Sequence, residues 1–282
     1  MENKATTVEK KARSAKKLVL LLLMNLLFLS VLIVVVVNFH LAPADKKADI
    51  AVYLDRGVWD EGTHAVKKML EWMNYSVEYV DASTINEVGL DKYRVLCIPG
   101  GDMYDYSQDI SAKGKENIKN FVRDGGGYVG ICAGAYFACS NVVWRGTTLS
   151  MTSLGLLQGT ATGPINEIAP YPNYTMCKVN IVNHEHPITQ SVPENHWILY
   201  YWGPAFVTSH NANVTILGNY DQGNRTAMLA FEYGKGRVFL IGTHPEIEED
   251  NNRDEVSFGN ELDDQGSEWE LVRNVLLWCT KE

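Results

Sequence analysis

The sequence predicts an α/β protein with a mainly parallel β-sheet covered by helices on both faces, preceded by one N-terminal transmembrane helix. Two patterns support this fold class. Between residues 49 and 131, short apolar runs alternate with amphipathic helical patterns, which is the order of elements that builds a parallel sheet. Before them, an almost unbroken apolar run covers residues 18–39. The 282 residues therefore leave room for one membrane segment and one large domain.

The N-terminal region has the pattern of an uncleaved membrane anchor. Residues 1–17 carry six lysines and arginines against two glutamates, and a helix of the next 22 residues reaches about 33 Å, enough for a bilayer core of about 30 Å. A cleaved secretory signal is the alternative, since Ala42-Pro43-Ala44 resembles a cleavage site. Because a basic flank stays in the cytoplasm, we expect a single-pass protein with a cytoplasmic N-terminus and an extracellular or lumenal domain. The predicted segments are a cytoplasmic basic segment (1–17), a transmembrane helix (18–39), a linker (40–48) and a domain (49–282).

The first half of the domain has the clearest elements. Val66, Met69, Leu70 and Met73 recur at helical spacing, and a run of three glycines from Gly125 ends a second helical pattern. Apolar runs between the helices indicate buried strands. Strands are expected at 49–54, 76–80, 94–98 and 128–131, and helices at 62–75, 112–123 and 133–139.

The second half is less regular. Residues 141–224 are rich in Gly, Pro, Asn and Tyr, which predicts additional antiparallel strands and loops. Residues 227–233 and 237–241, joined by a glycine-containing turn, predict a β-hairpin. A last helix is expected from Ser267, with Ser267 and Glu270 forming a capping box.

The net charge restricts the class of binding partner, and the cysteine count restricts the possible disulfides. A net charge of −9, with no basic face visible after residue 50, argues against a nucleic-acid partner. Five cysteines in an oxidising compartment leave at least one thiol unpaired, and Cys132 is the expected free one. Cys97 is expected in the core, and Cys139 and Cys177 either pair or remain two buried thiols. No cofactor is predicted.

The strongest local signal is Gly130-Ile131-Cys132-Ala133-Gly134, a nucleophile between glycines where a strand meets a helix. Glycines let the chain turn sharply and a substrate approach. The first turn of a helix also favours the thiolate, because its N–H groups and dipole stabilise negative charge. Cys132 is therefore predicted to be a nucleophile.

A proton-transferring base and an oxyanion hole complete such a site. His244 follows the strand at 237–241, at the sheet edge where α/β proteins place their sites, and Glu246 can accept a hydrogen bond from its imidazole. The backbone amides of Gly101, in Pro99-Gly100-Gly101, and of Ala133 are the expected oxyanion donors.

Other residues near these motifs are candidate substrate contacts: Gly100, Asp102, Tyr104, Tyr201 and Trp202. Arg56 and Trp59 are weaker candidates, with ordinary loop surface as the alternative. His184 and His186 lack the accompanying ligands of a recognised metal site, so no metal site is predicted.

The order Pro-Gly-Gly, Gly-x-Cys-x-Gly and His-Pro-Glu resembles the class I glutamine amidotransferases. More narrowly, GICAGAYFA at 130–138, PGGD at 99–102 and YYWGP at 200–204 resemble the amidotransferase-like N-terminal domain of biotin-protein ligases. The resemblance covers roughly residues 49–250. It implies a flavodoxin-like sheet and a Cys132–His244–Glu246 triad, and it does not imply a substrate.

The resulting functional hypothesis is a membrane-anchored cysteine hydrolase or amidase that acts on a small-molecule amide or peptide-like substrate. Neither a synthase domain nor a ligase domain fits in the chain beside the predicted domain. The alternative is a non-catalytic domain that binds a small molecule or a partner in the same cleft.

Overall fold

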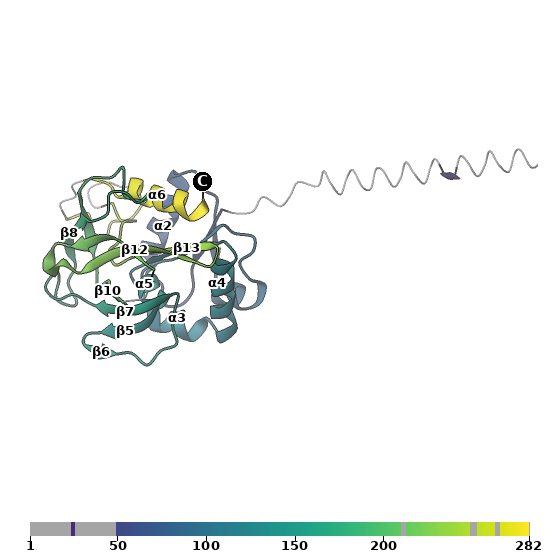
Figure 1. Cartoon of the computed structure of the whole chain (residues 1–282), viewed down its shortest axis with the longest axis horizontal. Helices are drawn as coiled ribbons and strands as arrows, with labels where there is room; N and C mark the ends of the chain where they lie inside the picture. The colour runs from purple at the N-terminus through teal and green to yellow at the C-terminus, as the bar shows by residue number, and fades with distance from the viewer. Residues whose placement is uncertain (1–23, 26–48, 210–212, 249–252, 263–265, 282) are drawn as a thin grey trace, which may run out of the picture. The chain divides into compact units, whose positions relative to one another are not determined.

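A mixed β-sheet organises the domain (Figure 1). The computed structural model describes residues 24–25, 49–209, 213–248, 253–262 and 266–281. Within these residues, 13 strands form one sheet with the main order β2-β1-β3-β4-β13-β12-β10-β7-β5-β6. Strand β11 pairs with β12 and β8, and β8 pairs with β9. The strands at the β2 end of this order pair in parallel, whereas most strands at the β6 end pair antiparallel.

Five strands at one end of the sheet run parallel to one another. They are β1 (Ile50–Tyr53), β2 (Val77–Val80), β3 (Val95–Ile98), β4 (Gly127–Ile131) and β13 (Gly236–Ile241). All residues of β1, β3 and β4 are buried, as expected for parallel strands covered on both faces. Because parallel strands end at the same edge, the segments after β3, β4 and β13 meet there.

The remaining strands form a mostly antiparallel extension beyond β13, in which only the described pair β5 and β7 is parallel. They are β5 (Cys139–Trp144), β6 (Thr147–Thr148), β7 (Leu157–Gly163), β8 (Thr175–Ile181), β9 (Asn195–Tyr200), β10 (Ala205–Thr208), β11 (Thr215–Tyr220) and β12 (Thr226–Tyr233). Among the described residues, seven of the twelve strand pairings are antiparallel. The expectation of a mainly parallel sheet is therefore wrong, because the segment after β5 reverses direction repeatedly and joins the same sheet.

Helices cover both faces of the sheet, as predicted. Ile50 and Val52 of β1 share one core with α2 (Asp60–Trp72) and α6 (Trp269–Thr280). Ala51 and Tyr53 point to the opposite core, because strand side chains alternate between faces. That second core contains side chains of α3 (Met103–Asp109), α4 (Ala112–Arg123) and α5 (Ala133–Ala138). A π-helical turn (Thr84–Val88) and a 3₁₀ turn (Gln222–Asn224) complete the elements.

The start of α6 differs from the expected capping box. The helix begins at Trp269, and its N-cap residue, Glu268, makes no side-chain cap hydrogen bond. Ser267 instead donates its hydroxyl hydrogen to the buried carboxylate of Glu248, while its oxygen accepts the Trp269 amide at 3.2 Å. Glu270 pairs with Arg273. A tertiary contact with Glu248 has replaced the local capping pattern.

The five cysteines are all free and buried. Cys139 belongs to the core on one face of the sheet and Cys177 to the core on the other, so the sheet separates the two thiols. The expected Cys139–Cys177 pair is therefore wrong, and the alternative of two buried thiols is correct.

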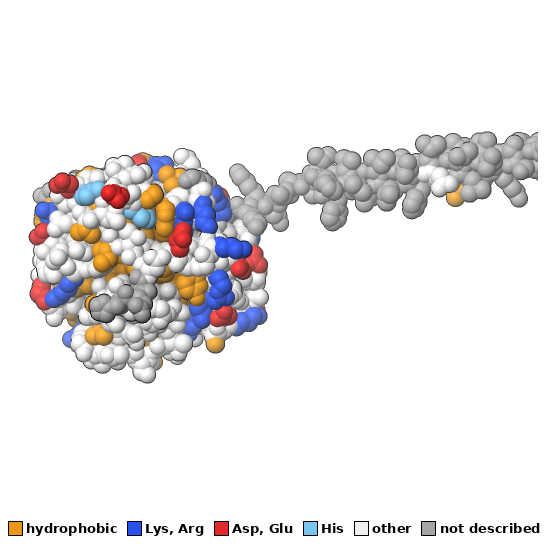
Figure 2. Space-filling view, in the orientation of Figure 1, with side chains coloured by type: hydrophobic (Ala, Val, Ile, Leu, Met, Phe, Trp, Pro, Cys, Tyr) orange, Lys and Arg blue, Asp and Glu red, His pale blue; other side chains and the backbone are white. Residues whose placement is uncertain are grey.

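The expected transmembrane segment at residues 18–39 lies outside the described residues, apart from residues 24–25. The part of the chain that the structure describes contains no helix long and apolar enough to cross a membrane. On the face of the domain shown in Figure 2, acidic and basic side chains are interspersed.

Candidate active site

Cys132 lies on a strained turn between β4 and α5. Its φ of 48° and ψ of −105° place a non-glycine residue in a rarely populated conformation. The flanking glycines are required by close packing: a Cβ at Gly134 would lie 2.0 Å from the Ile98 carbonyl oxygen, and one at Gly130 would lie 2.8 Å from the Gly134 carbonyl oxygen. The Cys132 amide donates a 3.0 Å hydrogen bond to the Ile241 carbonyl, which fixes the turn against β13. The turn has the strand-to-helix geometry that exposes a nucleophile.

His244 follows β13 at the same sheet edge and is fixed by hydrogen bonds on both sides of its ring. Its amide donates to the Leu199 carbonyl at 2.9 Å. The Nδ1 atom lies 2.8 Å from Oε1 of Glu246, and both side chains are buried. The Nε2 atom lies 3.4 Å from the Tyr201 carbonyl oxygen. Carboxylate and carbonyl oxygens only accept hydrogen bonds, so this arrangement favours a proton on each ring nitrogen.

The electrostatic environment also favours the imidazolium. Burial lowers the pKa of His244, but the neighbouring Glu246 carboxylate and Cys132 sulfur raise it by more, to about 10. His244 is therefore positively charged at neutral pH, which places a buried cation between Glu246 and the Cys132 turn.

The other four thiols are in a different environment. Burial raises the pKa values of Cys97, Cys139 and Cys177, and it raises that of Cys279 to about 12. These thiols are thus held neutral and unreactive. Cys132, in contrast, lines a cavity together with His244.

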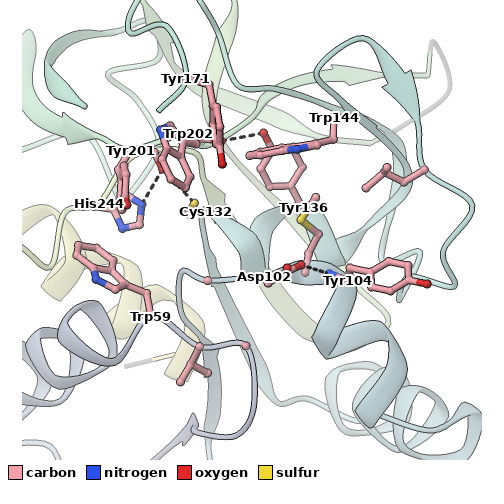
Figure 3. A pocket seen from close by; sticks show the side chains of 15 residues that line it. Trp59, Asp102, Tyr104, Cys132, Tyr136, Trp144, Tyr171, Tyr201, Trp202 and His244 are labelled. Carbon is pink, nitrogen blue, oxygen red and sulfur yellow. Dashed lines mark hydrogen bonds between the residues drawn. The ribbon is translucent and has the colours of Figure 1, made fainter. Parts of the chain in front are cut away.

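The Tyr201 carbonyl oxygen is close to both the thiol and the imidazole. Cys132 Sγ is 3.6 Å from it, and Figure 3 shows both side chains directed toward this oxygen. The next residue, Trp202, has a φ of 64°, and its indole N–H donates to the Asn173 carbonyl at 3.0 Å. The Tyr136 hydroxyl donates to the Trp202 carbonyl at 3.0 Å. The Tyr201–Trp202 segment is therefore anchored from two sides.

The Pro99-Gly100-Gly101 loop packs against the same site. Trp59 donates its amide hydrogen to the Gly100 carbonyl at 2.9 Å, which orders the loop. A Cβ at Gly100 would lie 2.6 Å from His244 Cε1, so only glycine allows this approach. Among the described residues, no acceptor is present for the amides of Gly101 and Ala133, the two expected oxyanion donors. Ala133 is the first residue of α5, where helical amides lack partners within the helix.

A cavity of about 580 Å³ opens beside Cys132. Four predicted contacts, Asp102, Tyr104, Tyr201 and Trp202, line it, as does Gly101. Asp102 also accepts the Tyr104 amide at 2.8 Å and so caps α3. Gly100, Ala133 and Glu246 are not among the residues that line the cavity.

Of the two weaker candidates for substrate contacts, Trp59 lines the cavity and Arg56 does not. The Trp59 ring meets the His244 ring edge-on with centres 5.1 Å apart. The Arg56 guanidinium is paired with Asp105 and Asp109, each at 2.7 Å.

Sequence reasoning missed one side of the cavity, formed by Tyr136, Trp144, Leu149 and Tyr171. Tyr136 lies within the GICAGAYFA segment, so this motif could have indicated that it lines the cavity. The others follow no local motif, and the pairing of β5 with β7 that positions their region depends on the tertiary fold.

The sequence profile of the N-terminal domain of biotin-protein ligases matches residues 48–274. The chain belongs to this family. The biotin-protein ligase of Schizosaccharomyces pombe is 29% identical over 186 residues, which are 61% of this chain but only 29% of the ligase. An uncharacterised protein of Chlamydia muridarum is 27% identical over 213 residues, covering 70% of this chain and 80% of that protein.

Solved structures show the same fold at low sequence identity. A glutamine amidotransferase of Thermotoga maritima superposes with a TM-score of 0.55 at 16% identity, covering 84% of this chain and 99% of that protein. A ThuA-like protein of Bacteroides uniformis superposes with a TM-score of 0.52 at 14% identity, covering 84% and 93%. The domain therefore has an amidotransferase-like α/β fold.

Proposed function

We propose that this chain is a cysteine-dependent amidohydrolase of glutamine-amidotransferase type, with Cys132 as nucleophile, His244 as proton-transferring group and Glu246 as the residue that orients His244. The observation that supports this most strongly is the buried His244 side chain, whose Nδ1 lies 2.8 Å from Glu246 and whose ring borders the same cavity as Cys132. The parallel half of the sheet, β2-β1-β3-β4-β13, corresponds in this proposal to the flavodoxin-like part of the fold.

In the first half of the reaction, the Cys132 thiolate attacks the carbonyl carbon of a carboxamide. The carbonyl oxygen becomes negative and accepts hydrogen bonds from the amides of Gly101 and Ala133. The C–N bond then breaks as the His244 imidazolium gives its proton to the departing nitrogen. An amine or ammonia leaves, and a thioester remains on Cys132.

In the second half, water attacks the thioester and gives a proton to the neutral His244. The C–S bond breaks, the carboxylic acid is released, and the thiolate–imidazolium pair is restored. The net reaction converts an amide and water into a carboxylic acid and an amine or ammonia. Glu246 keeps the imidazole in one orientation throughout, because its carboxylate binds Nδ1 and leaves Nε2 toward the reacting atoms.

The test is the reaction of the full chain with p-nitrophenyl acetate, an acyl donor that reports the formation of the thioester. We expect a burst of nitrophenolate close to one equivalent, followed by slower turnover, and a mass increase of one acetyl group on the Cys132 peptide. The Cys132→Ala protein should show no burst, whereas Cys139→Ala, which removes a buried thiol on the far end of α5, should keep it. A burst of equal size in Cys132→Ala would contradict the assignment, and a folded wild type without a burst would favour a binding domain.

We also propose that residues 18–39 anchor the chain in a membrane, with residues 1–17 in the cytoplasm and the domain extracellular or lumenal. The support is the apolar run of 22 residues and its basic flank. Release of the full chain from membranes by alkaline carbonate would contradict this anchor.

A further inference from the structure

The walls of the cavity beside Cys132 are mainly aromatic. A continuous series of ring contacts runs around it, with successive ring centres 4.2 to 6.3 Å apart. In order, the rings are Tyr136, Trp144, Tyr171, Trp202, Tyr201, Trp59 and His244. Figure 3 shows these rings on both sides of Cys132. Such walls favour flat, weakly polar groups that can stack.

The described lining of the cavity offers no unpaired cation to a carboxylate. Among the described residues that line it there is no lysine or arginine. Within the described lining, His244 alone carries positive charge, and Glu246 already balances it. A ligand carboxylate at this position would therefore lose its hydration without gaining an ionic partner.

Two arginines lie near the cavity but are not among its lining residues. The Arg56 guanidinium binds Asp105 and Asp109. Arg145 is exposed and lies over the Tyr171 ring, with its guanidinium carbon 4.8 Å from the ring centre. The charged lining residue next to the predicted oxyanion loop is the acid Asp102, which repels a ligand carboxylate further.

We propose that this cavity selects a carboxamide carried on a ring-bearing body without a carboxylate, and that free glutamine is a poor ligand. The assignment rests on the proposed function, because it takes Cys132 as the atom that the amide must reach. The scissile amide lies at Cys132, between the His244 side and the Gly101 loop. The ring of the substrate stacks toward Trp144 and Tyr171, at the other end of the series of ring contacts.

The experiment compares two chloromethyl ketones that replace a side-chain carboxamide. One keeps the free α-ammonium and α-carboxylate groups of glutamine. The other carries an N-phenylacetyl group and a neutral α-carboxamide instead. Alkylation of Cys132 in the full chain is followed by peptide mass spectrometry, and each rate is divided by the rate of the same reagent with glutathione. Iodoacetamide, which carries no recognition group, measures the intrinsic reactivity of the thiol.

We expect the ring-bearing reagent to label Cys132 at least about tenfold faster than the glutamine-like reagent, because an unpaired carboxylate is costly to desolvate. Tyr171→Ala should reduce the rate of the ring-bearing reagent, divided by the iodoacetamide rate of the same variant, about two- to tenfold through the loss of stacking. Tyr233→Ala is the matched control, because that ring also lies below an arginine, Arg123 at 5.9 Å, but is not in the cavity.

Two results would overturn the proposal while leaving the nucleophile intact. One is faster labelling by the glutamine-like reagent, particularly if Arg145→Gln abolishes that advantage. The other is an unchanged preference in Tyr171→Ala. If none of the three reagents labels Cys132 in preference to the four buried thiols, the proposed function itself fails, and the substrate assignment fails with it.

Discussion

Glu246→Gln tests whether one buried carboxylate controls the charge of the site. The substitution keeps the shape of the side chain and removes the negative charge 2.8 Å from His244 Nδ1. In the wild type the pKa of His244 is raised to about 10. Without the carboxylate, burial opposes the charged imidazole and only the Cys132 sulfur remains to favour it. We therefore expect the variant to hold a neutral imidazole at pH 7.

The magnitude follows from the two protonation equilibria. A histidine with a pKa of about 10 is almost entirely protonated at pH 7, whereas one at or below about 6.5 is at most about one quarter protonated. Removing one partner of a buried ion pair costs about 3–5 kcal/mol, divided here between folding stability and the loss of the His244 proton. Alkylation of Cys132 at pH 7 should then slow by at least about tenfold, because the thiolate loses its cationic neighbour.

The assay is the rate of iodoacetamide alkylation of Cys132 between pH 5 and 10, measured by peptide mass spectrometry. In Glu246→Gln the profile should move to higher pH, while thermal unfolding shows that the variant is still folded at the assay temperature. Glu255→Gln is the control, since that carboxylate is exposed and pairs with Lys68 rather than His244. Identical wild-type and Glu246→Gln profiles would refute the view that Glu246 sets the charge of His244.

Two further predictions concern the same imidazole. Gly100→Ala would place a Cβ 2.6 Å from His244 Cε1, so the ring or the loop must move. We expect the free energy of unfolding in urea to fall by about 1–3 kcal/mol and Cys132 alkylation to slow. A variant with wild-type values in both measurements would show that the close approach is not required. The raised pKa of His244 also predicts a pH-dependent stability, fully present below about 6.5 and lost as the pH rises through about 10. The difference in melting temperature between wild type and His244→Gln should therefore shrink across this window, and a difference that grows with pH would contradict the charged state.

The parallel half of the fold could be predicted because its signals are local. The predicted helix 112–123 coincides with α4, and the predicted strand 128–131 lies within β4. The glycines around Cys132 also have a local meaning, because each sits where a Cβ would clash with a carbonyl oxygen. In this region, periodicity and turn chemistry agree with the tertiary fold.

The antiparallel half could not be predicted in the same way. Which strand pairs with which is decided by contacts far apart in the sequence, such as the parallel pairing of β5 with β7 and the position of β10 between β7 and β12. The missed wall of the cavity belongs to this half: Trp144 ends β5, and Tyr171 lies between β7 and β8. No spacing rule connects these residues to Cys132.

Three unfavourable features meet at the edge of this otherwise apolar sheet. Cys132 and Trp202 both have positive φ angles, which cost free energy in residues with side chains. Glu246 is fully buried, and its Oε2 atom has no hydrogen-bond partner among the described residues. His244 is buried with a pKa raised to about 10. A fold that needed only a stable core would be more stable with an apolar pair at positions 244 and 246 and a relaxed turn at 132. Strain and buried charge at one point, beside one cavity, support the proposed role of this site in chemistry rather than in packing.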